Sequence, residues 1–328
     1  MALSKEVRRI AIVGTGAIGA SWAAFYLARG FDVIATDPDS GAEASVRHYI
    51  DTAWQGLKVL GISPKGSPEH LCFKSNIAEA VAEADFIQES GPDHKEVKIG
   101  LFAEMDQAAP PDSIIASSSA ELTMSVMQSA CRHPERCVIG HPLNPPHIMP
   151  LVEVAGGAKT SAEAIQQAIA FYASIGKKPI LLRKEVVGHA ANRLEAALYR
   201  EIASLISQGV LDVADADAAV CWGPGLRWGV MGPSLLFHLG QARGGIHHFM
   251  KHVAGPMSKS WSDLGNPELT PDLAQCIVDG VVRGVGDRPL EKLAQERDEV
   301  LLGLLRLRAK FSNSSKPAGR SARGGRKG

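Results

Sequence analysis

The sequence predicts an α/β fold in which a doubly wound, mostly parallel sheet precedes a smaller all-α domain. Short apolar runs alternate with helical patterns through the first part of the chain, as strands and helices do in such sheets. From Asn192 onward the apolar residues keep helical spacing, and little strand signal remains. The length of 328 residues leaves room for two domains of ordinary size.

The apolar runs and the residues that interrupt them define the elements of the first domain. We expect strands at 10–13, 33–35, 71–73, 85–89, 113–116, 137–141, 151–155 and 179–182, and helices at 18–29, 41–60, 77–84, 95–108 and 162–175. Ligands of doubly wound sheets bind outside the carboxyl ends of the strands. Residues 89–93 and 117–119 both fall at such ends.

The second domain is expected to be helical throughout. Its helices are predicted at 192–209, 213–222, 233–239, 246–253, 271–282 and 290–311. The change of pattern lies between Arg183 and Gly188. We therefore predict a first domain at 1–187, a helical domain at 188–311, and a tail at 312–328.

The charges of the chain are balanced overall but unevenly placed. Lysine plus arginine equals aspartate plus glutamate at 35 each, so net charge gives no indication of a polyanionic partner. The segment 312–328 is rich in serine, glycine and arginine and carries no acid, which predicts disorder. A solvated extension is the favoured interpretation of this basic tail, ahead of contact with nucleic acid or membrane lipid.

The cysteines and the chain start indicate the compartment. An odd number of widely spaced cysteines predicts neither a disulfide framework nor a metal site. The first residues, MALSKEVRR, lead directly into a strand without the apolar region of a signal peptide, and no run of 18 apolar residues exists. We expect a cytoplasmic protein with reduced thiols and no metal.

A glycine-rich turn predicts a dinucleotide site. Gly14, Gly16 and Gly19 stand between a strand and a helix, with Asp37 placed 18 residues beyond the last glycine. Such glycines allow a tight turn, close approach of a pyrophosphate and close helix packing, while the acid binds the ribose hydroxyls. The loop residues Ala17 and Ile18 complete the site, and no lysine or arginine follows Asp37 to hold a 2′-phosphate. The Rossmann-type pattern therefore favours NAD over NADP.

A histidine and a glutamate lie on successive predicted strands. His141 ends one strand, and Glu153 follows twelve residues later on the next. If the two strands are antiparallel neighbours, the carboxylate meets the imidazole and stabilises its cation. His141 would then be a general base for a hydroxyl proton during hydride transfer. A packing histidine at an interface is the alternative that the sequence leaves open.

Three further polar residues are candidates for the same site. Asn192 begins the first helix of the second domain, where its amide could hold a reacting oxygen. Asn144 follows His141 closely, and Ser119 ends a run of serines at a strand end. A helix cap, an interdomain hydrogen bond and a simple turn are the alternative roles of such residues.

The segments GTGAIGASWA, ASSS, GHPLNPPHIMPLVEV and VGHAANRL together resemble the 3-hydroxyacyl-CoA dehydrogenase superfamily over roughly residues 7–310. The resemblance implies that His141 is the catalytic base, Glu153 its partner and Asn192 a ligand of the substrate carbonyl. It also implies that Asp93 and Lys98 contact NAD and that Asn144 lies near the nicotinamide. The resemblance further implies a homodimer formed through the helical domain. One departure is Ala120, which stands where the family usually has a substrate-contacting serine, so that either Ser119 substitutes for it or that contact is absent.

The stretch from Gly223 to Met250 resembles the members of that superfamily that oxidise L-carnitine, and less closely those that oxidise L-gulonate. Carnitine carries a trimethylammonium group, which aromatic faces bind best, and a carboxylate, which an arginine binds best. The candidates are Trp222, Trp228 and Phe237 for the cation and Arg227 for the carboxylate. Helix packing is the alternative role of these aromatic residues. The alternative functions are oxidation of another 3-hydroxy acid or of a 3-hydroxyacyl-CoA, and binding of NAD(H) without catalysis.

Overall fold

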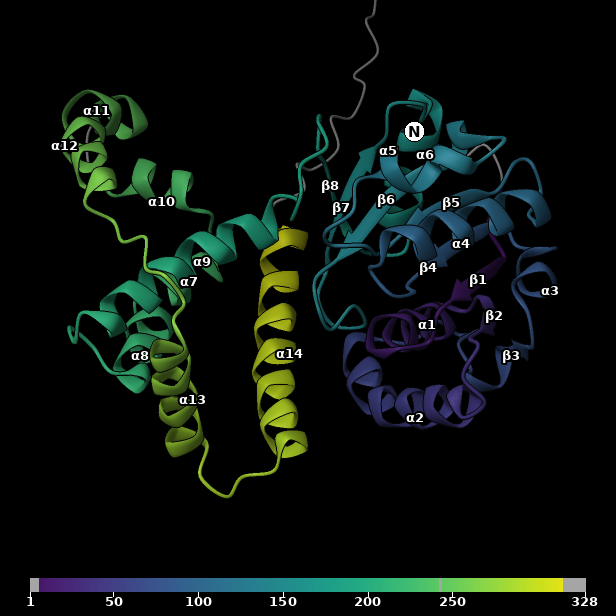
Figure 1. The fold of residues 1–328 in the computed structure, drawn as a ribbon, viewed down its shortest axis with the longest axis horizontal. Helices are drawn as coiled ribbons and strands as arrows, with labels where there is room; N and C mark the ends of the chain where they lie inside the picture. Colours follow the sequence, from purple (N-terminus) through teal and green to yellow (C-terminus); the bar gives the residue numbers. More distant parts are fainter. Residues whose placement is uncertain (1–5, 242–243, 315–328) are drawn as a thin grey trace, which may run out of the picture. The chain divides into compact units, whose positions relative to one another are not determined.

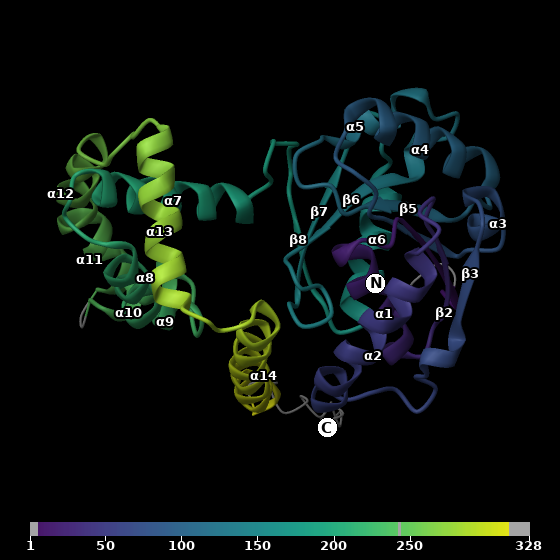
Figure 2. The same ribbon diagram turned by 60° about the horizontal axis from the view of Figure 1, so that its bottom comes forward.

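The computed structural model describes residues 6–241 and 244–314, with side chains described as far as residue 310. The chain forms two compact units that divide after Leu194 (Figures 1 and 2). Residues 312–314 of the predicted disordered tail are helical, and the remainder, 315–328, lies outside the described residues.

The first unit is built on one eight-stranded sheet. Its strands are β1 (Arg9–Val13), β2 (Asp32–Thr36), β3 (Leu71–Lys74), β4 (Phe86–Glu89), β5 (Ile114–Ser117), β6 (Cys137–Pro142), β7 (Leu151–Gly156) and β8 (Lys178–Leu181). They lie in the order β3-β2-β1-β4-β5-β6-β7-β8. All neighbours are parallel except β6 and β7, which are antiparallel. The predicted doubly wound, mostly parallel sheet is confirmed.

Helices cover both faces of this sheet. They are α1 (Ala17–Arg29), α2 (Ala42–Leu60), α3 (Ile77–Val81), α4 (Lys95–Ala108), α5 (Met124–Met127) and α6 (Ala162–Ser174). Successive side chains of β1 point to opposite faces of the sheet and therefore belong to two separate cores. Ile10 and Ile12 pack with α1, α2 and α6, whereas Ala11 and Val13 pack with α3, α4 and α5. Figure 2 shows α1 and α2 on one side of the sheet and α4 and α5 on the other.

A buried polar network crosses the middle of the sheet. The Tyr172 hydroxyl donates to Gln88 Oε1 at 2.7 Å, and Gln88 Nε2 donates to Ser118 Oγ at 2.8 Å. The backbone of Gly140 lies against this tyrosine, because a Cβ at that position would be 2.1 Å from the hydroxyl oxygen. The glycine before His141 is therefore required by packing.

The second unit is helical, as predicted. It contains the rest of α7 (Ala191–Ser207), then α8 (Val213–Trp222), α9 (Pro224–Trp228), α10 (Pro233–Leu239), α11 (Gly245–His252), α12 (Ala254–Lys259), α13 (Pro271–Val285) and α14 (Leu290–Ser314). The short helices α9 and α12 were not predicted, since neither is long enough to show a periodic apolar pattern. Within the described part of the chain, no helix combines the length and the apolar character that crossing a membrane requires.

Candidate active site

The glycine-rich turn after β1 has the geometry of a dinucleotide cradle. Gly14 has a φ of 89°, and a Cβ there would lie 2.7 Å from the amide nitrogen of Gly91. At Gly19 a Cβ would lie 1.9 Å from the Gly14 carbonyl oxygen. Gly16, the residue before α1, has no atom within 4 Å of its Cβ position. Packing thus requires two of the glycines, while the third leaves open space at a helix N-terminus, where a pyrophosphate fits.

Asp37 is held rigidly at the end of β2. Its Oδ2 accepts from the amide of Thr15 at 2.7 Å and from the Thr15 hydroxyl at 3.1 Å. Its Oδ1 accepts from the amide of Asp39 at 3.1 Å. The carboxylate is therefore fixed beside the glycine-rich turn, where it can accept hydrogen bonds from ribose hydroxyls. Thr15 was not singled out in the sequence, because its role depends on the turn geometry.

The predicted pair of His141 and Glu153 is present. The two residues are register partners on the antiparallel strands β6 and β7, and His141 Nδ1 lies 3.0 Å from Glu153 Oε2. Both side chains are buried. The second glutamate oxygen accepts from the amides of Ala190 and Ala191 at 2.9 and 3.1 Å, at the start of α7.

These contacts fix the charge of the glutamate and the tautomer of the histidine. Burial alone would raise the pKa of Glu153, but the hydrogen bonds from His141 and from the amides of Ala191 and Ala190 outweigh it and lower the pKa. An ionised carboxylate only accepts, so His141 Nδ1 carries the proton that it donates to Glu153. In the neutral ring the other nitrogen, Nε2, then has a lone pair, as a general base requires.

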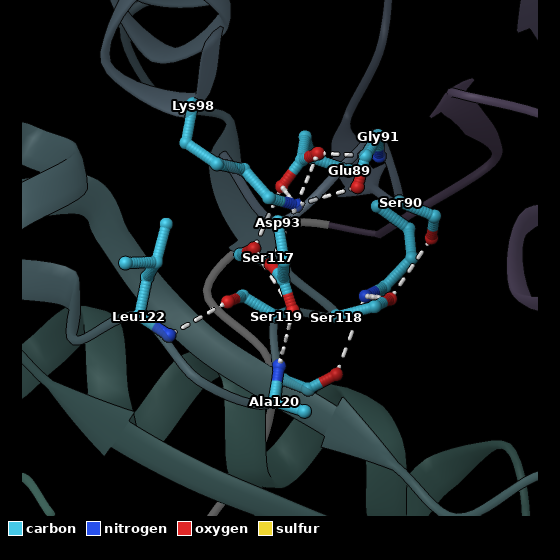
Figure 3. A network of polar contacts seen from close by, with 12 residues as sticks. Glu89, Ser90, Gly91, Asp93, Lys98, Ser117, Ser118, Ser119, Ala120 and Leu122 are labelled. Atoms are coloured by element: carbon cyan, nitrogen blue, oxygen red, sulfur yellow. Dashed lines mark hydrogen bonds and ion pairs between the residues drawn. The ribbon is translucent and has the colours of Figure 1, made fainter. Parts of the chain in front are cut away.

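A buried cluster holds the ends of β4 and β5 (Figure 3). Lys98 Nζ contacts both carboxylate oxygens of Glu89 at 2.7 and 2.9 Å and the carbonyl of Gly91 at 3.0 Å. Ser117 Oγ donates to Glu89 at 2.6 Å. Asp93, the other predicted NAD ligand of this segment, lies 3.5 Å from the same ammonium. Lys98 therefore secures the turn at Gly91 against which Gly14 packs, and its direct contact with NAD stays a prediction.

The serine run ends in a tight turn beside this cluster. Ser119 is buried, and its hydroxyl accepts from the amide of Leu122 at 3.1 Å (Figure 3). The amide of Ala120 donates to Asp93 at 3.2 Å. The Ser119 hydroxyl thus stabilises the turn, and its predicted contact with substrate in place of a serine at position 120 stays a prediction.

Asn144 lies between His141 and Glu153 in the chain, and Asn192 follows both. Asn144 is exposed in the loop that follows β6, three residues after His141. Asn192 is half-buried in the first turn of α7, directly after the alanine amides that hold Glu153. Their predicted contacts with nicotinamide and with the reacting oxygen stay predictions.

Comparison with known proteins identifies the family. Residues 9–186 match the model of the 3-hydroxyacyl-CoA dehydrogenase NAD binding domain, and residues 188–266 match that of the C-terminal domain of the same enzymes. The chain belongs to the 3-hydroxyacyl-CoA dehydrogenase family. It is accordingly an NAD-dependent oxidoreductase, and the predictions of family, enzyme class and cofactor are confirmed.

Individual relatives extend over nearly the whole chain. An L-carnitine dehydrogenase of Streptomyces griseus is 42% identical over 96% of this chain and 94% of its own length. One of Pseudomonas aeruginosa is 41% identical over 93% of this chain and 95% of its own. Among solved structures, a 5-formyl-3-hydroxy-2-methylpyridine 4-carboxylic acid 5-dehydrogenase has a TM-score of 0.80 at 27% identity and covers 93% of this chain and 99% of its own. The 3-hydroxybutyryl-CoA dehydrogenase of Escherichia coli gives 0.61 at 26% identity and covers 72% of this chain and 50% of its own.

A second histidine stands next to the pair in this dehydrogenase. His189 is 2% exposed, and its ring centroid lies 4.9 Å from that of His141. Its Nε2 is 2.8 Å from the carbonyl oxygen of Ser119. Sequence reasoning did not single out this residue, although its place between Gly188 and the start of a helix was visible.

The predicted substrate residues of the helical unit lie on three short elements. Trp222 ends α8, Arg227 and Trp228 lie in α9, and Phe237 lies in α10. All four side chains are exposed, Trp222 to 81%. Phe237 stacks on Phe249 of α11 with ring centroids 4.4 Å apart. Their role in binding substrate stays a prediction.

Proposed function

We propose that this dehydrogenase oxidises the 3-hydroxyl of L-carnitine to 3-dehydrocarnitine with NAD as the hydride acceptor. The observation that carries the choice of substrate is the identity of about 40% with L-carnitine dehydrogenases over more than nine-tenths of the chain. The buried pair of His141 and Glu153 supports the chemistry, because oxidation of an alcohol requires a group that removes the hydroxyl proton.

The mechanism follows from the tautomer of His141. Nε2 accepts the proton of the substrate hydroxyl, and the ring becomes a cation. Glu153 stabilises that cation through Nδ1 and remains ionised, since its other oxygen is held by the first turn of α7. Asn192 holds the reacting oxygen. Gly14–Gly19 and Asp37 would hold NAD, which would supply the hydride acceptor.

The substrate groups away from the reacting carbon require their own contacts. We assign the trimethylammonium to the faces of Trp222, Trp228 and Phe237 and the carboxylate to Arg227. A cation over an aromatic face gains about 0.5–2 kcal/mol. The support for this assignment is chemical, because these exposed side chains supply the types of group that carnitine needs.

A second candidate function is binding of NAD(H) without turnover. Ala120 favours it, because alanine lacks the hydroxyl of the substrate-contacting serine that the family usually has at this position. A dehydrogenase of L-gulonate or of another 3-hydroxy acid is the remaining enzymatic alternative. A single panel of substrates distinguishes both candidates from a carnitine dehydrogenase.

The test is the appearance of NADH with L-carnitine, D-carnitine, L-gulonate and 3-hydroxybutyryl-CoA in parallel at alkaline pH. We expect turnover of L-carnitine only, and we expect His141→Ala to lose turnover while binding NADH as the unaltered protein does. Turnover of gulonate or the CoA ester in its place would reject the substrate assignment and retain the base. NADH binding without any turnover would favour the non-catalytic candidate.

We further propose that the protein is a cytoplasmic homodimer that associates through the helical unit. The five cysteines are all unpaired, as expected in a reducing compartment. Many large apolar side chains of the helical unit are exposed, which favours a partner surface.

A further inference from the structure

The hydrogen bond of His189 determines which of its nitrogens carries a proton. Nε2 lies 2.8 Å from the carbonyl oxygen of Ser119, and a carbonyl oxygen only accepts. Nε2 must therefore be the N–H of the ring. In the neutral imidazole, Nδ1 is then an acceptor with a free lone pair.

That acceptor is buried without a partner. Nδ1 is out of contact with solvent, and no hydrogen-bond donor reaches it among the described residues. Buried acceptors are nearly always satisfied, because an unsatisfied one loses its hydration without compensation. The observation points to a donor that arrives with a ligand.

The groups around His189 keep its ring neutral. Burial lowers the pKa of His189 and is the largest influence on it. The neighbouring His141 lowers it further, whereas the Ser119 carbonyl and the carboxylates of Glu153 and Asp93 raise it without cancelling the effect of burial. Among the described residues no carboxylate is hydrogen-bonded to His189, whereas Glu153 is hydrogen-bonded to His141.

The backbone holds His189 in this position at a conformational cost. His189 has a φ of 48°, and Gly188 before it has a φ of 76°. Two successive residues in the left-handed region are uncommon, and a residue other than glycine stays there only when its surroundings require it. The amide of Gly188 donates to the Ala120 carbonyl, and the amide of Ala190 donates to Glu153. The same segment therefore places His189 and fixes the catalytic pair.

We propose that Nδ1 of His189 accepts a hydrogen bond from an N–H or O–H group of bound cofactor or substrate, next to His141. This inference rests on the proposed function, which brings nicotinamide and a secondary alcohol to His141. The possible donors there are the nicotinamide carboxamide and, in a substrate with more than one hydroxyl, a hydroxyl other than the one that His141 deprotonates. His189 is then a ligand-contacting residue of the reaction, in addition to tying the turn at Ser119 to the start of α7.

Two substitutions separate the acceptor from the structural tie. In His189→Asn the amide oxygen takes the place of Nδ1, whereas in His189→Gln the amide nitrogen takes the place of Nε2 and can still donate to Ser119. We expect His189→Asn to keep ligand affinity within about threefold and His189→Gln to lose roughly tenfold or more, as for an acceptor removed from a buried contact. Thermal unfolding of each variant reports the structural cost separately.

Titration calorimetry with reduced cofactors identifies the source of the donor. If the carboxamide is the donor, His189→Gln weakens NADH binding but not binding of the reduced 3-acetylpyridine analogue, which lacks the amide N–H. If a second hydroxyl of the substrate is the donor, NADH binding is unchanged and KM rises for L-gulonate, the polyhydroxylated alcohol of the panel. Unchanged NADH affinity together with an unchanged KM in His189→Gln, or a greater loss in His189→Asn than in His189→Gln, would overturn the proposal. NADH binding is measured without turnover, so the role of His189 toward the cofactor can be tested even if carnitine is not the substrate.

Discussion

A single proton on His141 decides whether it can act as a base, and Glu153 decides where that proton sits. In the variant Glu153→Gln the amide oxygen can remain with the amides of Ala190 and Ala191, which turns the NH2 group toward His141 Nδ1. Nδ1 then becomes the acceptor and Nε2 carries the hydrogen, so the base is lost. We expect kcat to fall by roughly 10²–10⁴.

Steady-state kinetics of Glu153→Gln, together with calorimetric titration of NADH, checks this expectation. NADH affinity should be unchanged, since the glycine-rich turn is not altered. Glu153→Asp is the matched control, because it keeps an acceptor for Nδ1–H and should retain more activity than the glutamine variant. A glutamine variant with a kcat within threefold of the original would remove Glu153 from the mechanism.

Residue patterns predicted part of the site and missed part of it, for physical reasons. The spacing of His141 and Glu153 was sufficient because neighbouring antiparallel strands bring fixed register positions together. His189 was missed because its role depends on a left-handed backbone and on an unpaired nitrogen, neither of which has a sequence signal. Lys98 was expected at the cofactor, but the sequence could not show that its ammonium is buried against Glu89.

At the scale of the elements, packing of α6 against β6 depends on the absence of a side chain at Gly140. An alanine Cβ there would lie 2.1 Å from the Tyr172 hydroxyl, which must then leave its bond to Gln88. We expect Gly140→Ala to lower the free energy of unfolding by about 1–3 kcal/mol. Gly100→Ala is the matched control, since its Cβ meets nothing within 4 Å in α4, and it should be neutral or stabilising by up to about 1 kcal/mol.

Thermal and urea unfolding of the two glycine variants measures this difference directly. The melting temperature of Gly140→Ala should fall by several degrees, while that of Gly100→Ala should stay or rise. Equal stability of the two variants would mean that Tyr172 can move without cost, and the buried network would then be less restrictive than the geometry indicates.

The end of α4 is joined to the loop before β6 through Asp106. Its carboxylate accepts from the amides of Arg132 and His133 at 2.6 and 3.0 Å and from Arg136 Nη2 at 2.9 Å. Burial alone would raise the pKa of Asp106, but these donors outweigh it and lower the pKa. Asp106→Asn leaves the buried guanidinium without its counter-charge, and we expect a loss of about 3 kcal/mol at neutral pH.

The depressed pKa also gives this contact a pH dependence of known sign. A carboxyl whose pKa is lower in the folded state contributes its full stability above the unfolded pKa, about 3.9. The contribution is lost as the pH falls through the lower, folded value. Urea midpoints measured downward from about pH 5 should therefore decline more steeply for the original protein than for Asp106→Asn. Parallel declines would show that Asp106 is not responsible for the acid sensitivity.

The elements themselves were largely predictable because their signals are local. The eight strands of the sheet were anticipated from apolar runs, and α2, α4 and α6 from periodic patterns, with ends shifted by one or two residues. The helix α5 and the 3-10 turn after it were not, since Met124–Met127 is too short to show a period. Strand order was also beyond the sequence, because it depends on contacts between segments far apart in the chain.

At the scale of the whole molecule, the two units differ in how they bury apolar surface. The first unit has two large cores on the two faces of its sheet. The core cluster described in the helical unit is small: Ile206, Val213, Ala216 and Leu273. Many large apolar residues of the helical unit lie outside this small core and are exposed, and oligomerisation is one way in which small domains gain stability.

The helix α13 presents the clearest such surface. Val278, Val281 and Val282 have the i, i+3, i+4 spacing of one helix face, and they are 52%, 45% and 62% exposed. If a second copy of the chain covers this face, the protein should sediment at about twice its mass of 34.8 kDa. Because a charge buried in an apolar interface costs several kcal/mol, we expect Val278→Glu to shift the protein to monomers at micromolar concentration.

Analytical ultracentrifugation over a dilution series distinguishes the outcomes. Arg283→Ala, on the same helix but outside the valine set, should leave the dimer intact. A monomeric original protein would reject the homodimer, and a dimeric Val278→Glu variant would move the interface away from α13. The monomeric variant is also expected to have a lower melting temperature than the original protein if association stabilises the helical unit. In that case the difference in melting temperature depends on protein concentration, whereas a loss of packing within one chain does not.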